Sequence, residues 1–379
     1  MIILWYLLLL AGFAYWLMQL VSAVRAARSV PVLERIPIHE LGVWPRVSVI
    51  MPARNEEKKM VSALETRLED DYPGVEYIIV DDRSTDRTGQ IADAFSRKDP
   101  RVRVLHIRDL PEGWLGKLHA MDRAAAVARG SWLLFSDIDV VVMPGALKKA
   151  IAYAEQNGVD HVAILPEIYP AGFIVDILNT VFVRLLVLTG RLWEVSDPRK
   201  AAAVGSGSFN LVRRSAFDRA QGFEKIRLEH GDDVALGRIL KASGSRQVVM
   251  NGRGCMGVRM YGSLSEAMTA VERPTYTALG KSSVVRLLIA GLVILWLELS
   301  PFLAFIPISV SYNIFAGSVM VAISFGTAML VNRWFGRQVW SAFFSPLAAV
   351  LMAVFIWRSG ILGALRGGVY WRGTFYPTK

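Results

Sequence analysis

The sequence predicts an α/β domain with a mostly parallel sheet, joined to transmembrane α-helices at both ends of the chain. Its 379 residues exceed the roughly 250–300 residues at which a single core stops growing. Hydrophobic residues make up 53% of the chain and charged residues 20%, and this balance argues against an ordinary soluble enzyme. In the middle of the chain, short β-rich runs alternate with helical stretches, as they do in βαβ units.

The first apolar segment is long enough to cross a bilayer. Residues 2–24 carry no charge, and as a helix they extend about 35 Å, against a hydrocarbon core of about 30 Å. The segment lacks the basic start and short apolar core of a cleaved signal peptide, and Arg25 and Arg28 follow it. We therefore expect an uncleaved anchor over residues 1–28, with the following chain in the cytoplasm.

The C-terminal apolar region, residues 284–357, is divided into pieces at residues 284–297, 302–310, 314–331 and 339–357. If the first two pieces form one kinked span, three crossings leave the basic tail, residues 358–379, outside. If they form a hairpin or two short spans, the tail returns to the cytoplasm. The tail holds four basic residues, against Arg333 and Arg337 in the alternative loop, so the positive-inside rule favours a cytoplasmic tail. The sequence thus predicts an integral protein of the inner or plasma membrane.

The charge and cysteine content exclude several classes of protein. The net charge is +10, but residues 287–379 hold six basic residues and one acidic residue, so much of the excess lies among apolar segments. Membrane orientation explains such charge without nucleic acid, and we expect no nucleic-acid partner. The single cysteine, Cys255, excludes an intramolecular disulfide framework, and the five histidines form no zinc-type cluster with it.

Between the apolar ends, residues 46–281 predict a cytoplasmic α/β domain. Expected strands recur at residues 47–51, 77–80, 102–106 and 132–135, with helices between them at residues 56–68, 85–95 and 117–128. This order is typical of parallel strands linked by crossover helices. Ligands of such open sheets bind beyond the carboxyl ends of the strands, so the residues that follow each strand are the candidates for chemistry.

Three of these strand ends are acidic: residues 52–57 after the first strand, 81–88 after the second and 136–139 after the fourth. Such residues can simply cap helices, and Asp82, Ser84 and Thr85 are candidates for that role. Three acidic ends in succession fit capping poorly. Asp137 and Asp139 alternate after an apolar strand, so both carboxylates can reach one hard cation. Neither a Gly-x-Gly-x-x-Gly nor a Walker-type motif is present, which disfavours a dinucleotide oxidoreductase and a P-loop ATPase.

Four motifs together resemble a family 2 glycosyltransferase with a GT-A, Rossmann-like fold. They are Pro-Ala-Arg-Asn-Glu-Glu at 52–57, Asp-Asp-Arg-Ser-Thr-Asp-Arg-Thr at 81–88, Gly-Trp-Leu-Gly-Lys at 113–117 and Asp-Ile-Asp at 137–139. The resemblance covers residues 46–280. With its apolar ends and the tail element Trp371-Arg372-Gly373, the chain is similar to membrane enzymes of the hopene-associated and carotenoid-ester (diaponeurosporenoate-type) glycosyltransferases.

The resemblance implies a nucleotide-sugar donor, expected to be a UDP-sugar, and assigns residues to it. Asp137 and Asp139 would hold Mg²⁺ or Mn²⁺ against the diphosphate, where the metal neutralises charge on the departing group. Lys117 would contact phosphate, although a solvated helix lysine is the alternative. The implied donor-binding residues are Pro52, Arg54, Glu56, Asp81, Asp82, Lys117 and Asp137.

Asp232-Asp233-Val234-Ala235-Leu236 matches the family's Glu-Asp-x-x-Leu element, with Asp233 at the position of the catalytic base and Asp232 in place of Glu. Two adjacent carboxylates repel, so one of them has its pKa raised toward the working pH, as a general base requires. The expected step is inverting: Asp233 takes the proton of the acceptor hydroxyl while that oxygen attacks the anomeric carbon. The alternative is that both residues merely favour a helix N-terminus.

The acceptor side is less defined. Gly205, Ser206 and Gly207 stand where the family has a flexible element near the acceptor, and a plain glycine turn is the alternative. The Gln/Arg-x-x-Arg-Trp element of processive members is missing from residues 271–276, which favours transfer of a single sugar. Arg273 is one candidate to replace its contacts with the diphosphate, together with Arg253 and Arg259.

Residues 173–193 are apolar but carry polar side chains within one helical face, which predicts an amphipathic helix lying at the membrane interface. A core-facing helix of the catalytic domain is the alternative, and a spanning helix would split the site across the bilayer. An interfacial helix would suit a lipid acceptor, whose hydroxyl or carboxyl reaches the site while its tail stays in hydrocarbon.

The sequence as a whole predicts a metal-dependent, inverting hexosyltransferase of glycolipid biosynthesis. Two other functions remain open at this point: transfer to a polyprenyl phosphate, and a catalytically silent membrane scaffold that binds sugar nucleotides. A transporter is disfavoured because Glu298 is the only charge expected to be embedded in the membrane and about 240 residues resemble a soluble domain. The sugar, the acceptor lipid and the oligomeric state are not predicted.

Overall fold

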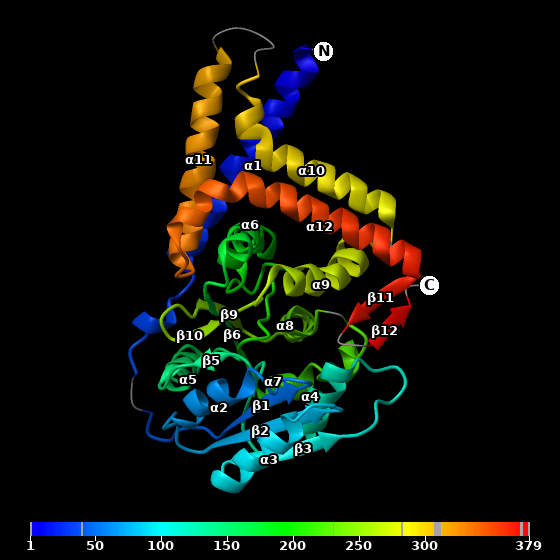
Figure 1. Ribbon diagram of the computed structural model, residues 1–379. Coiled ribbons are helices and arrows are strands. Elements are labelled where there is room, and N and C mark those ends of the chain that lie inside the picture. The colour runs from blue at the N-terminus through cyan, green and yellow to red at the C-terminus, as the bar shows by residue number, and fades with distance from the viewer. Residues whose placement is uncertain are drawn as a thin grey trace. The chain divides into compact units, whose positions relative to one another are not determined.

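The computed structural model describes residues 2–38, 41–229, 231–281, 283–306, 312–371 and 374–377 (Figure 1). The chain forms two compact units. The sheet unit comprises Ser29–Ile168 and Leu192–Val258, and the helical unit comprises Met1–Arg28, Tyr169–Arg191 and Arg259–Lys379.

The sheet unit is built on seven strands in the order β3-β2-β1-β4-β8-β6-β9. Strand β8 is antiparallel to its neighbours β4 and β6, and the other neighbouring pairs are parallel. The predicted α/β fold with a mostly parallel sheet is therefore confirmed. The strands are β1 (Val47–Ala53), β2 (Val75–Asp82), β3 (Val102–Ile107), β4 (Trp132–Phe135), β6 (His161–Leu165), β8 (Asn210–Arg213) and β9 (Gln247–Asn251).

Crossover helices link the parallel strands; the first three lie within a few residues of their predicted positions, and the fourth was not predicted. They are α2 (Met60–Leu68), α3 (Thr88–Lys98), α4 (Gly116–Val127) and α5 (Ala146–Asn157). Two helices follow strand β8, α7 (Arg214–Arg219) and α8 (Asp232–Ala242), and α8 begins with the two aspartates of the predicted base element. A small second sheet joins β5 (Val141–Val142), β10 (Met256–Val258) and β7 (Glu167–Ile168).

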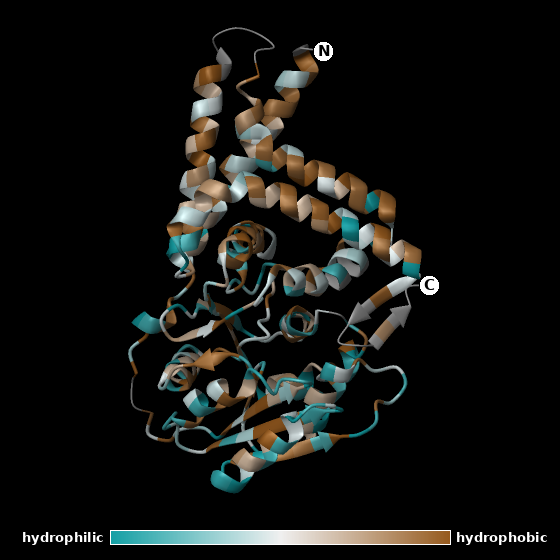
Figure 2. Cartoon of the chain, viewed as in Figure 1, coloured by the Kyte–Doolittle hydropathy of each residue, from teal (hydrophilic) through white to brown (hydrophobic). Residues whose placement is uncertain are grey.

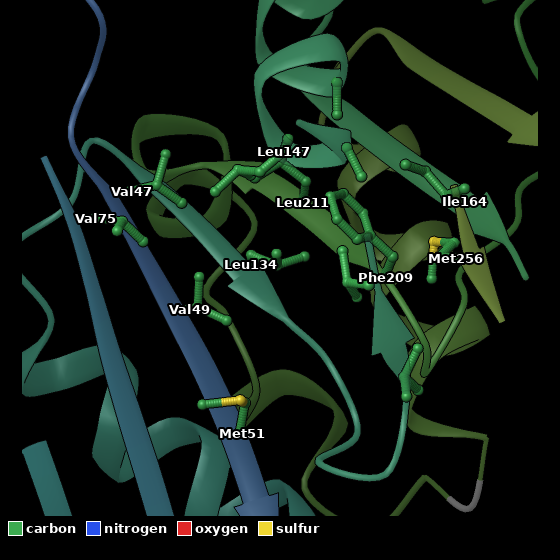
Figure 3. Packing of buried hydrophobic residues seen from close by; sticks show 14 of the residues in the cluster. Val47, Val49, Met51, Val75, Leu134, Leu147, Ile164, Phe209, Leu211 and Met256 are labelled. Carbon is green, nitrogen blue, oxygen red and sulfur yellow. The ribbon is translucent and has the colours of Figure 1, made fainter. Parts of the chain in front are cut away.

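Successive side chains of each strand point to opposite faces of the sheet, and those on one face form the core of this unit. Val47, Val49 and Met51 of β1 join one buried cluster with residues of α2, α3 and α5 (Figure 3). Ile50, which points to the opposite face, is also fully buried, so β1 is covered on both sides, as a central parallel strand requires. In the register of the sheet, Ala53 at the end of β1 lies beside Asp81. The carboxyl ends of β1 and β2 therefore meet at one edge.

The helical unit contains the apolar helices. They are α1 (Ile2–Ser29), α6 (Phe173–Gly190), α10 (Val284–Leu303), α11 (Tyr312–Trp334) and α12 (Ser345–Arg366), together with the shorter α9 (Leu264–Pro274) and the strands β11 (Gly368–Trp371) and β12 (Thr374–Pro377). Figure 2 shows hydrophobic residues concentrated along the long helices. Among the described residues, five helices are long and apolar enough to cross a membrane, at 3–29, 173–194, 284–303, 314–334 and 339–366.

The predicted C-terminal pieces correspond to helices with different ends. Helix α10 continues past Glu298, includes Pro301 and ends at Leu303, so the helix does not run on through the second predicted piece. Residues 307–310 of that piece lie outside the described residues, as do Arg372, Gly373 and Lys379 of the tail. The last piece is a short 3₁₀ turn (Val339–Phe344) followed by α12.

Helix α6 belongs to the helical unit, so the predicted domain over residues 46–281 includes segments that the structure groups with the terminal helices. Four of its polar side chains, Asp176, Asn179, Thr180 and Arg184, are buried rather than facing solvent. The Arg184 guanidinium lies 2.5 Å from the Glu298 carboxylate of α10, and the Thr180 hydroxyl donates to Ser341. Buried polar groups need such partners, and α10 and the 3₁₀ turn supply one each for Arg184 and Thr180. The interfacial position of α6 stays a prediction.

Candidate active site

The loops that follow β1 and β2 are bound to each other at the carboxyl edge of the sheet. The Asn55 amide N–H donates to the Ser84 hydroxyl, and the Asn55 side-chain oxygen accepts from the Thr85 amide 2.8 Å away. Asn55 has φ of +57° and Arg83 has φ of +54°, a left-handed conformation that non-glycine residues rarely adopt. Ser84 and Thr85 therefore join the two loops and do not cap α3, which begins at Thr88 with Asp86 accepting from the Thr88 amide.

The two aspartates at the end of β2 have separate partners. Asp82 is buried, and its carboxylate accepts hydrogen bonds from Nε and Nη2 of Arg83, at 2.7 and 3.0 Å. Asp81 lies 3.0 Å from Nδ1 of His106, whose other ring nitrogen lies 3.1 Å from Asp93. The hydrogen bond with Asp81 raises the pKa of His106, despite the opposing effect of partial burial. The predicted nucleoside side of the site is thus a network of short charged contacts.

A pocket lies over the strand ends and brings together six of the predicted site residues. Of the sequence-predicted residues, those that line it are Pro52, Lys117, Asp137, Gly207, Asp232 and Asp233. Arg54, Glu56, Asp81, Asp82, Asp139, Gly205 and Ser206 are outside its lining. Arg54 nevertheless keeps a buried Nε atom without a hydrogen-bond partner among the described residues. Arg273 lies in α9 of the helical unit, and the structure does not describe its side chain.

Lys117 connects the two acidic parts of the pocket. Its ammonium lies 2.9 Å from Asp137 and 3.0 Å from Asp232, so one cation bridges carboxylates that are 95 positions apart in the chain. Loss of water around the ammonium lowers the pKa of Lys117, but the carboxylates of Asp137 and Asp232 outweigh this effect and raise it above its usual value. Lys117 is therefore not a solvated helix lysine.

Asp233 is held at the N-terminus of α8 in surroundings that favour its protonated form. Its carboxylate accepts from the Gly207 amide at 3.0 Å and from the Val234 amide at 2.8 Å. Burial, followed by repulsion from Asp232, raises the pKa of Asp233 to about 6, although Lys117 acts in the opposite direction. A carboxylate with this pKa can accept a proton near neutral pH, as a general base must.

The glycine segment lets the chain approach this carboxylate closely. A Cβ atom at Gly205 would lie 1.8 Å from the backbone oxygen of Asp233, and one at Gly207 would lie 2.8 Å from the Asp137 carboxylate. Ser206 between them is buried. Gly205 is therefore required for packing against the backbone of Asp233, a side chain in place of Gly207 would displace the Asp137 carboxylate, and the predicted contact of both glycines with an acceptor is untested.

The Asp-x-Asp element has the chemistry of a hard-cation site. Ile138 is buried in the core, whereas Asp137 and Asp139 on either side of it are partly exposed. Asp139 lies 3.8 Å from the Lys59 ammonium. Within the described part of the chain, no group of three or more His, Cys, Asp or Glu side chains could hold a metal by itself. Two carboxylates leave coordination positions for phosphate oxygens, which suits Mg²⁺ or Mn²⁺ bound together with a diphosphate.

Asn210 is a pocket residue that the sequence reasoning missed. Its side-chain oxygen faces Nε2 of the buried His161, whose Nδ1 faces the Gln247 amide nitrogen. Burial lowers the pKa of His161 to about 4, and a neutral imidazole can donate from one nitrogen and accept at the other. Because the Asn210 side-chain oxygen is used by His161, the NH₂ group of Asn210 is the donor that is left for the pocket. The sequence holds a signal for this residue, because Asn210, His161 and Gln247 are polar residues within otherwise apolar strands.

These features define an α/β domain whose strand edge gathers carboxylates and one lysine around a single pocket. The family model described as "Glycosyl transferase family 2" matches residues 48–220. This part of the chain thus matches the family 2 glycosyltransferase domain that its motifs predict, and most of it lies within the mostly parallel α/β sheet unit.

Relatives of known sequence match different extents of the chain. The glycosyltransferase GlyG of Streptococcus pneumoniae is 34% identical over 114 residues, which cover 30% of this chain and 36% of that protein. The 4,4'-diaponeurosporenoate glycosyltransferase of Staphylococcus haemolyticus is 27% identical over 258 residues, which cover 66% of each protein. The match thus spans about a third of GlyG.

A solved structure shares the fold. It is a mannosyltransferase from Pyrobaculum calidifontis in complex with GDP-Man and Mn²⁺, with a TM-score of 0.56 and 16% sequence identity. The similarity covers 95% of this chain and 99% of the other chain. At this identity the comparison supports the fold and not the substrate.

The pKa of Asp233 predicts the pH dependence of activity. The ionised carboxylate is the active form of a base, so the rate should fall as the pH drops below about 6. Asp232→Asn removes a charge that raises this pKa, so the acidic limb of the pH–rate profile should move to lower pH. Initial rates of wild type and of Asp232→Asn between pH 4.5 and 8 locate the acidic limb of each protein. An acidic limb that stays in place in Asp232→Asn would contradict the coupling.

The close approach at Gly205 predicts a sharp difference between two glycines. Gly205→Ala forces the chain away from Asp233, and overpacking of this kind costs about 1–3 kcal/mol. Gly231→Ala, next to Asp232, is the matched control, because its added methyl group would meet open space. Thermal unfolding and initial rates should show a loss in Gly205→Ala only. Equal behaviour of the two variants would rule out the packing requirement.

Proposed function

We propose that the protein is an inverting, metal-dependent glycosyltransferase that moves a single sugar from a nucleotide-sugar donor to a membrane lipid. The observation that carries this proposal is Asp233, a carboxylate with a raised pKa in the same pocket as Asp137 and Lys117. The name of the diaponeurosporenoate relative supports a lipid acceptor, and the GDP-Man and Mn²⁺ of the solved neighbour support a nucleotide sugar with a divalent metal. A UDP-sugar remains our expectation for the donor.

Asp137 and Asp139 are the residues that would hold the cation. Bound there, a divalent metal supplies electrostatic stabilisation of the charge that develops on the departing nucleoside diphosphate. Lys117 provides a second, fixed positive charge at the same pocket. When a donor diphosphate and its cation are bound, Lys117 can exchange its contact with Asp137 for one with a phosphate oxygen.

Asp233 performs the proton transfer. The acceptor hydroxyl oxygen bonds to the anomeric carbon as the bond between that carbon and the diphosphate oxygen breaks, and its proton passes to the Asp233 carboxylate. Attack from the face opposite the leaving group inverts the anomeric configuration. The amides of Gly207 and Val234 hold the carboxylate in one orientation for this step. An acceptor that offers a carboxylate instead of a hydroxyl would arrive deprotonated and would not need the base.

The chain's connectivity indicates that α6 does not cross the membrane. Both of its ends continue into the sheet unit, at Ile168 and Leu192, so both ends lie on the catalytic side. Asn332, near the end of α11, donates to Thr180 of α6, and the Ser341 hydroxyl just before α12 is hydrogen-bonded to both. The end of α11 and the start of α12 therefore lie at the depth of α6.

The other end of α12 is fastened to α9, which follows the sheet unit directly. The Glu272 carboxylate of α9 accepts hydrogen bonds from Nη1 of Arg358 at 2.9 Å and from Nη1 of Arg366 at 2.8 Å. The Ser359 hydroxyl donates to the Glu272 carbonyl oxygen. Both ends of α12 are thus tied to elements on the catalytic side. We infer that α1, α10 and α11 cross the bilayer, that α12 lies along its cytoplasmic surface, and that the C-terminus is cytoplasmic.

Product analysis tests the proposed reaction. Protein in lipid nanodiscs is incubated with nucleotide sugars, Mn²⁺ and total membrane lipid, and mass spectrometry searches for a lipid heavier by one sugar. Asp233→Asn should lower the rate about 10²–10⁴-fold, as loss of a general base does, and should still bind UDP and Mn²⁺. Asp71→Asn, at an exposed surface pair, is the matched control with unchanged rate. A sugar phosphodiester product would indicate a polyprenyl-phosphate acceptor, and absence of both transfer and donor hydrolysis would favour a silent scaffold.

Labelling from the two sides of the membrane tests the orientation. A cysteine at Ile306, in the connection after α10, should react with an impermeant maleimide in intact spheroplasts, whereas a cysteine appended after Lys379 should react only after permeabilisation. The native Cys255 is buried and is replaced by serine in this background. External labelling of the C-terminal cysteine would show that α12 crosses the bilayer and would overturn this topology.

A further inference from the structure

Arg67, in the last turn of α2, is a buried arginine to which the sequence motifs assign no role. Only 3% of its surface is exposed. Its Nη2 atom donates to the Ser136 hydroxyl at 2.7 Å and to the Asp137 carbonyl at 2.8 Å, and Nη2 and Nε both reach the Val140 carbonyl, at 3.1 and 3.2 Å. One guanidinium therefore binds both ends of the turn that carries Asp137 and Asp139.

All of these acceptors are neutral oxygen atoms behind the turn. The guanidinium binds the carbonyls of Asp137 and Val140 and the Ser136 hydroxyl, and it makes no hydrogen bond with the carboxylates of Asp137 and Asp139, of which Asp137 lines the pocket. Burial lowers the pKa of Arg67 to about 10, with the two carboxylates acting to keep the charge, so Arg67 remains cationic at neutral pH. A buried cation is costly unless it is compensated, and the turn with its two carboxylates provides the compensation.

The same contacts extend to the catalytic base. The Ser136 hydroxyl accepts a hydrogen bond from Arg67 and donates one to the Ser208 carbonyl. The Asp137 amide donates to the Gly207 carbonyl at 2.8 Å. The Gly207 amide in turn donates to Asp233. The turn held by Arg67 is thus hydrogen-bonded to the glycine segment that orients the base.

We propose that Arg67 is a positioning residue that sets the Asp-x-Asp turn for binding of a divalent cation with a nucleoside diphosphate. The inference rests on the proposed function, because it assumes that Asp137 and Asp139 bind the metal. The planar fork of arginine can serve three acceptors at fixed angles, which the single ammonium of lysine cannot. Arg67 touches neither substrate nor metal and acts only through the turn.

The charge of Arg67 and its hydrogen bonds to the turn should have opposite effects on metal affinity. A measurement of metal affinity can therefore distinguish an effect of charge, an effect of positioning and a purely structural role. A positive charge near the site repels a cation, so removal of the charge alone would tighten metal binding. Release of the turn would weaken metal binding, because its carboxylates lose their fixed positions. A purely structural role would lower stability and leave the affinity of the folded protein unchanged.

The experiment compares Arg67→Met and Arg67→Lys with wild type and with Arg214→Met. Arg214 is a matched control because its guanidinium also binds three backbone carbonyls, those of Ala125, Ala128 and Gly130, in another part of the sheet unit. The dissociation constant of Mn²⁺ in the presence of UDP is measured by electron paramagnetic resonance of the full chain in nanodiscs. Hydrogen exchange of the peptide over residues 136–142 is measured without metal.

Both Arg67 variants should weaken Mn²⁺ binding about 10–100-fold, the range observed when groups that orient metal ligands are lost. They should also speed exchange over residues 136–142, whereas Arg214→Met should do neither. Unchanged or tighter Mn²⁺ binding in Arg67→Met overturns the inference.

Asp137→Asn separates this inference from the proposed function. It should abolish Mn²⁺ binding with little change in exchange, because it removes a ligand and leaves the turn in place. If wild type binds no Mn²⁺, the metal-dependent function fails, and the exchange data then decide the role of Arg67. Faster exchange in Arg67→Met would still support positioning of the turn, and unchanged exchange would refute it.

Discussion

The repulsion between carboxylates is the constraint on which this pocket depends. Asp137, Asp232 and Asp233 line one small cavity, and without a counter-charge they would push α8 away from the end of β4. The Lys117 ammonium, 2.9 and 3.0 Å from two of them, holds the two elements together. Burial, followed by the remaining repulsion from Asp232, raises the pKa of Asp233 despite the opposing effect of Lys117, and this suits Asp233 to the proposed role of base.

The helical unit meets a different constraint, because polar groups among apolar helices must pair with each other. Arg184 illustrates this: it is fully buried, pairs with Glu298 and lies over the ring of Trp16, with 4.5 Å between its guanidinium carbon and the ring centre. A pair of this kind contributes little net stability but makes other arrangements of the helices costly, since they would leave a bare charge. The pairings of α6 therefore specify which helices surround it.

The sequence was sufficient for the sheet and the acidic strand ends, because alternation and the spacing of βαβ units are local patterns. It could not predict that Lys117 bridges Asp137 and Asp232, or that Arg67 lies behind the Asp-x-Asp turn, since both depend on contacts between distant segments. For α6, the polar residues were recognised, but not their burial. A polar face looks the same in the sequence whether water or another helix satisfies it.

The joined loops after β1 and β2 have a consequence for donor binding. Because the backbone of Asn55 and the side chain of Ser84 are bound to each other, and the Thr85 amide is bound to the Asn55 side chain, neither loop can open alone. For a nucleoside bound at these loops, as the motifs predict, the contacts are ordered before the ligand arrives, and little conformational entropy is lost on association. Recognition there can be rapid and selective for shape, while in the proposed mechanism rearrangement is left to Lys117, which exchanges a carboxylate for a phosphate oxygen.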